Sequence, residues 1–433
     1  MHGKSKSNTM WLLVVMYFAQ TFFISYTKFF ALSLVWLIAV VVLDNFRICK
    51  LNIPGLKIYM LGLVFISIIG LNKYPVYMVV RDIYYETSNI VIIYIGYRYF
   101  YNNNSLKDLL KLYFVMISMM SIVAMAIGII NMFNGASFDV FRESFTIGIK
   151  AIEVFLPIYI VFCLIYKNVL VNSLVDKACL LIWFCQAVFS LGRTTLISIF
   201  GGIILFLALN IRKVCFNTKY LKRVMTIILC AVCVMLLALK IVPESVGNRF
   251  LDKFTNTFTE IDSNTEFDSI ADASSNWRGY EIYCAQEQFR DSTLVEKVIG
   301  SGNGTIIHIS YVPDLWHEIL DTQDGRTGVS VLHNSYYTLL IKGGVCTVTL
   351  FCLFFIKNIL RGIKLAKNEQ DFQISFMGII LVIMCVIMMM DAWVVRGMVQ
   401  SDTLLPWSFF FGWISAKVSN EFEGESVLVN MNR

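Results

Sequence analysis

Charged residues are scarce in this sequence. They make up 15% of its 433 residues, whereas hydrophobic residues make up 57%. An average soluble domain is about one quarter charged, and a soluble fold of this size exposes too much surface to hide so many apolar side chains. The composition therefore excludes an ordinary soluble protein and favours one that has lipid as its solvent.

A basic face with interleaved aromatic residues is also missing. The formal net charge is +6, but Lys and Arg fall in short separate segments, and half of the acidic residues lie in one stretch of the chain. Nucleic-acid binding needs a concentrated basic surface. We therefore expect no nucleic-acid partner.

Cysteine is present, but not in patterns that carry chemistry. Most of the eleven Cys lie inside apolar runs, and only Cys284 falls in the long hydrophilic segment described below. That segment cannot form an internal disulfide, and no Cys/His spacing typical of a zinc site occurs. Small apolar residues packed between helices are the simpler interpretation, and we expect neither a metal nor a cofactor.

Apolar runs long enough to cross a bilayer occur along most of the chain. A transmembrane helix needs about 20 such residues, with a range of roughly 17–25. The sequence predicts an all-α polytopic membrane protein with about twelve transmembrane helices and one large outer loop. Lys4 and Lys6 precede the first run and no clear cleavage site follows, which favours an uncleaved span. The expected spans lie near residues 10–27, 29–46, 57–72, 84–101, 110–133, 151–168, 177–192, 194–211, 224–242, 336–356, 372–390 and 403–417.

The basic residues between these runs set the expected orientation, because loops rich in Lys and Arg stay in the cytoplasm. With the N-terminus inside, the two most basic loops, within 212–223 and 357–367, both fall on the cytoplasmic side. Twelve spans return the C-terminus to the same side. We therefore expect a multi-pass protein with both termini cytoplasmic.

One hydrophilic segment interrupts the apolar pattern and faces outward in this topology. Residues 243–335 hold fifteen acidic residues against six basic ones, and three of the four His. Loops beyond roughly 12–15 residues are usually functional or disordered. Apolar residues at helical spacing predict an amphipathic helix over 277–294, capped by Ser275 or Asn276. The three glycines of residues 300–304 predict a tight turn.

These features divide the chain into four parts. Residues 1–242 form an N-terminal transmembrane bundle of about nine spans, and residues 243–335 form the large external loop. Residues 336–418 supply about three further transmembrane helices, and residues 419–433 form a cytoplasmic tail.

Three residues stand out as candidates for chemistry. Arg193 lies between two expected spans, where a charge is costly unless paired or hydrated; a snorkelling residue at a span end is an equally good interpretation. Arg278 opens the loop helix and offers a planar fork suited to phosphate oxygens, although a surface pair with Glu281 is the simpler interpretation. His333 lies where the loop re-enters the membrane. A neutral His can accept a proton, but it can also form a local hydrogen bond at a helix start.

Other charged residues have weaker claims. His308 and His317 suggest a metal together with nearby acids, but they do not form a two-His helical pattern, so a metal is not expected. Charges at span boundaries are functional candidates by default, and each could equally form a structural ion pair. The nearby acids are Asp314, Glu318, Asp321 and Asp324, and the boundary charges are Arg81, Asp82, Glu153, Asp391 and Arg396.

Taken in chain order, the candidates and the motifs around them form a recognisable set. Arg193 follows Ser190-Leu191-Gly192, and the outer loop then carries Trp277-Arg278-Gly279-Tyr280 and three alternate glycines from Gly300. The loop closes with His333-Asn334-Ser335-Tyr336, and Gly343-Gly344 follows ten residues after His333. This set, the span count and the late position of the loop resemble the O-antigen ligase and O-antigen polymerase superfamily of bacterial envelope glycan assembly.

The sequence departs from that superfamily's pattern at two positions. Thr347 stands where the second Gly of the loop-end pattern is usual, and Gly192 stands where a Ser usually precedes the Arg. Both departures weaken an assignment to the ligase branch.

The resemblance implies a fold similar to the all-helical membrane glycosyltransferases, and metal-independent glycosyl transfer outside the bacterial cytoplasmic (inner) membrane. The donor would be a polyprenyl-diphosphate-linked oligosaccharide, and the partners membrane lipid, a flippase and a chain-length regulator. In that chemistry Arg193 and Arg278 bind the diphosphate and stabilise its charge. His333 takes or orients the acceptor proton. Supporting positions fall to Trp277, Tyr280, Asn334 and Tyr337.

The leading hypothesis is a polymerase of lipid-linked repeat units, for O antigen, capsule or a similar surface polysaccharide. Its runner-up is an O-antigen ligase that transfers the glycan to lipid A core or another acceptor. A polysaccharide transporter or flippase is the alternative from another class, because twelve spans suit one. The sequence shows no internal repeat and places a long loop late in the chain, which argues against a transporter. A non-catalytic assembly factor that uses the loop for docking is the third alternative.

Overall fold

A computed structural model provides the structure of the chain. It describes residues 5–23, 26–43, 50–100, 105–135, 137–190, 192–210, 267, 269–311, 321–323, 325–368, 371–399 and 405–431, together with positions 219, 222, 226, 229 and 233.

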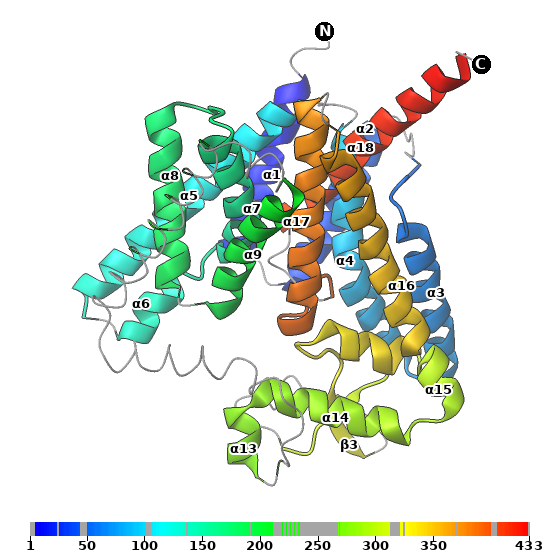
Figure 1. Cartoon of the computed structure of the whole chain (residues 1–433). Helices are drawn as coiled ribbons and strands as arrows, with labels where there is room; N and C mark the ends of the chain where they lie inside the picture. The colour runs from blue at the N-terminus through cyan, green and yellow to red at the C-terminus, as the bar shows by residue number, and fades with distance from the viewer. Residues whose placement is uncertain are drawn as a thin grey trace.

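The described residues are mostly helical, with one small sheet (Figure 1). The helices that precede residue 211 are α1 (Ser5–Phe22), α2 (Tyr26–Leu43), α3 (Leu56–Lys73), α4 (Val76–Phe100), α5 (Leu106–Phe133), α6 (Phe138–Ser144), α7 (Ile149–Tyr159), the π-helix η1 (Ile160–Ile165), α8 (Ser173–Phe189) and α9 (Arg193–Leu209). The later elements are α13 (Ile270–Ser275), α14 (Trp277–Asp291), α15 (Leu294–Ile299), β1 (Ile307–His308), β2 (Asp321–Gln323), β3 (Arg326–Val329), α16 (Ser335–Ala366), α17 (Phe372–Val394) and α18 (Leu405–Met431).

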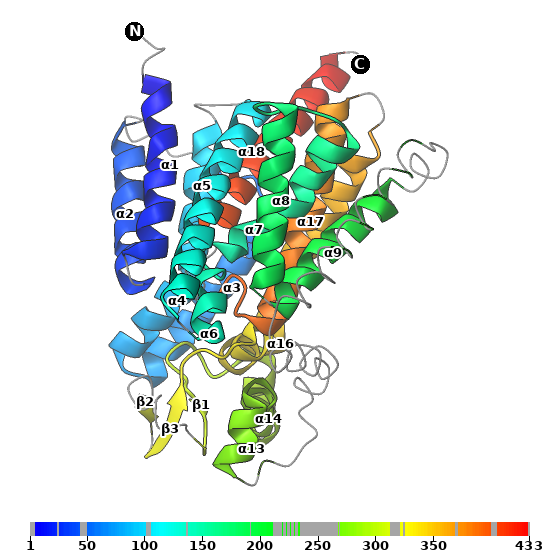
Figure 2. The ribbon, with the colours of Figure 1, turned by 90° about the vertical axis from the view of Figure 1, so that its left-hand side faces the viewer.

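The long helices pack side by side, and the segment from Phe267 to Asn334 lies across one end of them (Figures 1 and 2). We refer to the described residues of this segment as the outer unit. The start of α1 and the end of α18 both lie at the opposite end of the bundle. This arrangement agrees with the expected separation of termini and loop, whereas the cellular side of each end stays a prediction.

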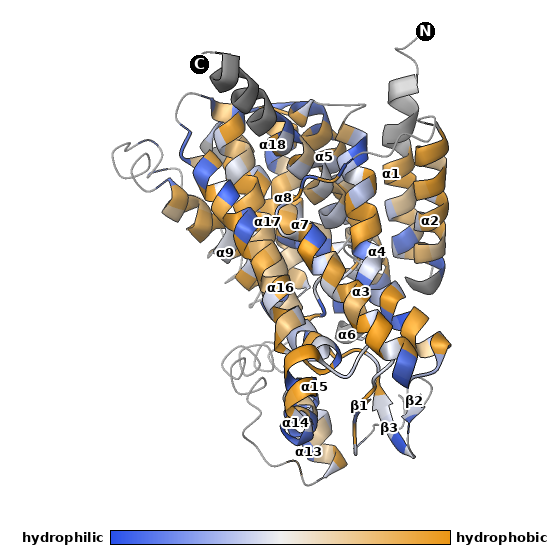
Figure 3. Cartoon of the chain, turned by 90° about the vertical axis from the view of Figure 1, so that its right-hand side faces the viewer, coloured by the Kyte–Doolittle hydropathy of each residue, from blue (hydrophilic) through white to orange (hydrophobic). Residues whose placement is uncertain are grey.

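Four helices are long and apolar enough to cross a membrane. They are α3, α5 over Leu106–Asn131, α16 and α17. Three shorter apolar helices cover Leu12–Phe22, Lys28–Val42 and Arg193–Leu209. Many residues at exposed positions of the long helices are apolar (Figure 3). The structure therefore fits an all-α membrane protein, but it supports four spans in the described part of the chain, not the twelve expected.

For α4, α7, α8 and α9 the shortfall has physical causes. The helix α4 has 25 residues, but Arg81, Asp82 and Glu86 lie in its first half. The helix α7 ends after 11 residues, where Pro157 removes a backbone donor and the chain continues as a π-helix. The helices α8 and α9 have 17 residues each. The expected span at 224–242 lies outside the described residues, apart from isolated positions.

The outer unit has its own small core. Phe267, Tyr280, Ile307, Val329 and Leu332 are buried together, so its described part is a packed structure. The predicted loop helix is confirmed as α14, which begins at Trp277. The antiparallel sheet in the order β1-β3-β2 was not expected. Strands of two to four residues are too short to give a pattern of alternating side chains.

The predicted turn at residues 300–304 is confirmed, and it fixes the outer unit to the bundle. Gly300, Gly302 and Gly304 all have φ between 80° and 98°, a conformation that favours glycine. The backbone N–H of Gly302 donates to the carbonyl of Lys342 at 2.8 Å, and that of Asn303 donates to the carbonyl of Ile66 at 3.0 Å. The turn therefore joins α15 to α3 and α16 through main-chain hydrogen bonds.

Replacement of Gly302 by Ala should destabilise the protein more than the same change at Gly325. Both glycines have positive φ, so an alanine at either position destabilises the folded protein by roughly 1 kcal/mol through backbone strain. At Gly302 a Cβ would also lie 2.5 Å from the backbone nitrogen of Gly70, whereas at Gly325 it meets open space. We expect the clash to cost a further ~1–3 kcal/mol. Melting temperatures of the two variants in detergent test this, and equal values would contradict the docking role of the turn.

Candidate active site

A cap and a buried tyrosine fix the position of α14 within the outer unit. The side chain of Asn276 accepts a hydrogen bond from the N–H of Gly279 at 3.1 Å, which confirms one of the two predicted caps. The Tyr280 hydroxyl accepts from the backbone N–H groups of Ser310 and Tyr311 at 2.9 and 2.7 Å. Burial raises the pKa of this phenol. Tyr280 therefore acts as a structural anchor behind the site.

The start of α16 is fixed in the same way. The side chain of Asn334 accepts from the backbone N–H groups of Tyr336 and Tyr337 at 3.0 and 3.3 Å. The Thr338 hydroxyl accepts from the N–H of Leu332 at 3.0 Å. Asn334 is the N-cap of the helix, so His333 stands immediately before the first turn in a fixed position.

A buried carboxylate joins these two helix starts. Glu281 lies one turn into α14 and is 2% exposed. It accepts from the backbone N–H of His333 at 3.0 Å and from the Trp277 indole at 2.9 Å. The Nδ1 atom of His333 lies 3.0 Å from each of its oxygens. All of these partners are donors, which a buried carboxylate needs.

This contact sets the proton position on His333. A carboxylate can only accept, so Nδ1 carries the ring proton of the neutral imidazole. Nε2 then has the lone pair and can take a proton. The His333 side chain is 24% exposed, so a ligand can approach it.

A small pocket of about 10 Å³, room for about one water molecule, lies beside this pair. Its lining comes from all three parts of the structure that meet here: Arg278, Glu281 and Ile282 of α14, His333 and Asn334, and Trp393 and Val394 of α17. Arg278 and His333, predicted from the sequence as functional residues, therefore face one cavity. The pocket lies where the outer unit meets the end of the bundle.

The segment after α17 is hydrogen-bonded to residues around the start of α16. The backbone N–H of Arg396 donates to the carbonyl of His333 at 2.6 Å. The Ser335 hydroxyl donates to the carbonyl of Arg396. Arg396 has φ of 70°, which is strained for a residue with a Cβ. Such strain persists where surrounding contacts hold it, often at functional sites.

Arg193 does not line the pocket of Arg278 and His333. It begins α9 and is half-buried. Two residues later the Thr195 hydroxyl donates to Glu153 at 2.6 Å. Arg193 thus belongs to the neighbourhood of a second charged cluster, inside the bundle.

That cluster surrounds Lys150. Its ammonium lies 2.6 Å from Glu153 and 3.1 Å from Asp391. Asp391 lies on α17, two residues before Trp393 of the pocket. The boundary charges Glu153 and Asp391, separate in the sequence, are therefore partners in one structure. Sequence reasoning did not select Lys150, because nothing in its local sequence marks it.

A third charged cluster binds the outer unit to α4. The Lys342 ammonium and the Gly304 N–H both lie 2.6 Å from one oxygen of Asp82. Arg81 pairs with Asp321 of β2 at 2.6 Å, which explains the boundary pair Arg81 and Asp82 as structural. Lys342 is 1% exposed and was not selected from the sequence either. A basic residue inside an apolar run of α16 was the available signal.

The remaining predicted residues occupy different places. Trp277 holds Glu281, whereas Tyr337 lines a neighbouring cavity. His308 lies in β1. In the described part of the chain no group of three or more His, Cys, Asp or Glu could hold a metal ion. His317, Glu318, Asp314 and Asp324 lie outside the described residues.

Comparison with known proteins gives no identity. No protein-family model and no curated protein sequence matches the chain. The resemblance to O-antigen polymerases and ligases therefore stays a prediction.

Replacement of Lys150 by Ala should be strongly destabilising, because it leaves Glu153 and Asp391 as buried acids without their shared cation. Breaking a buried ion pair in this way typically costs ~3–5 kcal/mol. A second change, Asp391→Asn, should restore part of the loss. Melting temperatures of the single and double variants test the cluster.

Lys73→Ala provides the matched control for this experiment. Lys73 pairs with Glu296 at 3.2 Å, but the two side chains are 42% and 30% exposed. Exposed pairs contribute about 0–1 kcal/mol. If Lys150→Ala lowered the melting temperature no more than Lys73→Ala does, the result would be incompatible with a buried charged cluster around Lys150.

Proposed function

We propose that the chain is a polymerase of polyprenyl-diphosphate-linked oligosaccharide repeat units. The reaction is a metal-independent glycosyl transfer on the outer face of the bacterial cytoplasmic membrane. The observation that carries the proposal is the His333–Glu281 pair beside Arg278 in one pocket. The sequence order of Arg193, Arg278 and His333, which resembles the O-antigen polymerase and ligase superfamily, supplies the substrate class.

His333 is the proposed base for the acceptor sugar. A hydroxyl is a weak nucleophile, and removing its proton during attack typically gives ~10²–10⁴-fold in rate. Nε2 receives that proton, and the carboxylate of Glu281 stabilises the resulting imidazolium through Nδ1. Trp277 and Asn334 keep the pair in place.

Arg278 is the proposed ligand of the donor diphosphate. When the bond between sugar and diphosphate breaks, negative charge builds on the phosphate oxygens. A guanidinium stabilises this charge through paired N–H donors. A diphosphate is a stable leaving group, so the reaction needs no general acid. Arg193, expected from the sequence as a second diphosphate ligand, does not line this pocket, so the proposed diphosphate contact rests on Arg278.

The membrane arrangement belongs to the same proposal. We propose that both termini lie in the cytoplasm, that a chain-length regulator and a flippase are partners, and that a lipid tail is held against the bundle. The supporting observations are the four apolar helices and the position of the outer unit opposite the termini.

Variants of the pocket test this function in cells that lack their own copy of the protein. The parent should give a ladder of glycan repeats on a gel. His333→Ala and Arg278→Ala should give mainly single units, with the His333 variant slowed ~10²–10⁴-fold. Glu281→Gln should also lose activity, because a carboxamide does not stabilise the imidazolium in the same way.

Arg326→Ala is the matched control, because Arg326 lies exposed on β3 of the same outer unit. It should leave the ladder unchanged. A normal ladder in all pocket variants, each present at parental levels, would rule out this site. A complete loss of glycan from the final acceptor, with polymer still made on the lipid carrier, would favour the ligase. Loss of lipid-linked units from the outer face would favour the transporter.

A further inference from the structure

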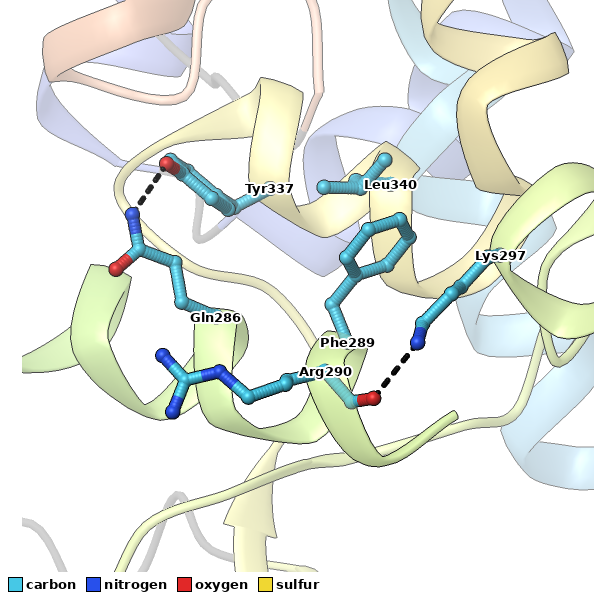
Figure 4. Close-up of a pocket in the computed structure, with 6 residues that line it drawn as sticks. All are labelled: Gln286, Phe289, Arg290, Lys297, Tyr337 and Leu340. Carbon is cyan, nitrogen blue, oxygen red and sulfur yellow. Dashed lines mark hydrogen bonds between the residues drawn. The ribbon is translucent and has the colours of Figure 1, made fainter. Parts of the chain in front are cut away.

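A second pocket lies next to the candidate active site. Its volume is about 460 Å³, and it lies between α14, α15 and the first turns of α16 (Figure 4). Its lining residues are Gln286, Phe289, Arg290, Lys297, Tyr337 and Leu340. None of them lines the pocket of His333. Gln286 follows Arg278 by eight residues of α14, which corresponds to about 12 Å along the helix.

The two charged side chains that line this pocket are both basic. Arg290 has five N–H donors, of which one nitrogen pairs with Glu287 at 2.8 Å. Lys297 uses one of its three donors on the carbonyl of Arg290 at 2.7 Å (Figure 4). Both side chains therefore retain donors suited to phosphate oxygens. The Gln286 amide donates to the Tyr337 hydroxyl at 2.8 Å and closes the other side.

The surface around this pocket is apolar and exposed, as expected for a surface in contact with lipid. Leu294, Val295 and Val298 of α15 are 79%, 64% and 44% exposed. The short helix lies at the end of α3, where Lys73 pairs with Glu296. Apolar residues of α3 are also exposed and lead to this point (Figure 3). The exposed side chains of α15 therefore extend the apolar face of α3 to the level of the lipid headgroups.

Aromatic residues mark the same level. Trp393, at the end of α17, is 43% exposed, and its ring lies 5.7 Å from that of Tyr336 and 6.4 Å from that of Tyr337. Trp and Tyr gather at membrane–water interfaces. Tyr337 also lines the second pocket, so that pocket lies beside this group of aromatic residues.

We propose that the pocket between α14, α15 and α16 binds the phosphate-bearing headgroup of a membrane lipid. Lys297 contacts the phosphate. Arg290, whose guanidinium points away from Lys297 toward Gln286 in Figure 4, contacts the far side of the headgroup. The lipid chain lies against Leu294 and Val298. If the chain is a polymerase, which is the proposed function above, two lipid-linked substrates must be held at once. This pocket then holds the second one while the first lies at Arg278 and His333.

Binding to the full-length protein in detergent tests the proposal. The probes are farnesyl diphosphate and short-chain phosphatidylglycerol, with inorganic diphosphate as the headgroup alone. At least one lipid should bind, and Arg290→Gln with Lys297→Gln should weaken it roughly tenfold or more. Farnesyl diphosphate as the tighter ligand would identify a prenyl-linked substrate, and phosphatidylglycerol a membrane phospholipid.

Two control variants separate a loss of lipid contacts from a general loss of structure. Lys297→Gln also removes a bond to the end of α14, so Lys297→Arg, which keeps the charge, should retain binding. Arg326→Gln, on β3, should leave it unchanged. The proposal would be overturned if the variant that carries both Arg290→Gln and Lys297→Gln bound lipid with the same affinity as the parent. It would also be overturned if inorganic diphosphate bound as tightly as the lipids. His333→Ala should keep the binding but lose polymerisation, so failure of this proposal is distinguishable from failure of the proposed function.

Discussion

The buried carboxylate of Glu281 is the contact on which the candidate site depends. It accepts hydrogen bonds from two directions, Trp277 on its own helix and His333 before α16. An isolated carboxylate at 2% exposure would carry a large desolvation cost. Those donors offset the desolvation cost only when the start of α16 is placed so that His333 reaches Glu281 on α14. The same contact that satisfies the carboxylate therefore orients the imidazole.

Local signals in the sequence predicted the parts of this arrangement that need only neighbouring residues. The helix that begins at Trp277, its cap Asn276 and the turn at Gly300–Gly304 depend on backbone preferences. Arg278 and His333 were selected individually, and the structure brings both to one pocket. The predictions of the helix, the cap and the turn succeeded because cap, turn and amphipathic patterns act over a few residues. The functional roles of Arg278 and His333 stay predictions.

The remaining features depend on contacts between distant parts of the chain. Glu281 was expected as a partner of Arg278 from their spacing, but its partnership with His333 spans 52 residues. Lys150 meets Asp391 across 241 residues, and Lys342 meets Asp82. The count of twelve spans failed differently. Apolar composition predicts a helix, but not whether that helix is long and free enough of charge to cross a bilayer, as α4 and α7 illustrate.

The docking of the glycine turn has a consequence for the modularity of the protein. The main-chain donors of Gly302, Asn303 and Gly304 find their acceptors on α16, α3 and α4. A fragment that contained the outer unit alone would lose all three acceptors, including the carboxylate of Asp82. The outer unit is thus not a domain that evolution or an engineer can exchange as a block between membrane scaffolds. A new specificity must instead arise by changing side chains within the pockets while the turn and its acceptors stay as they are.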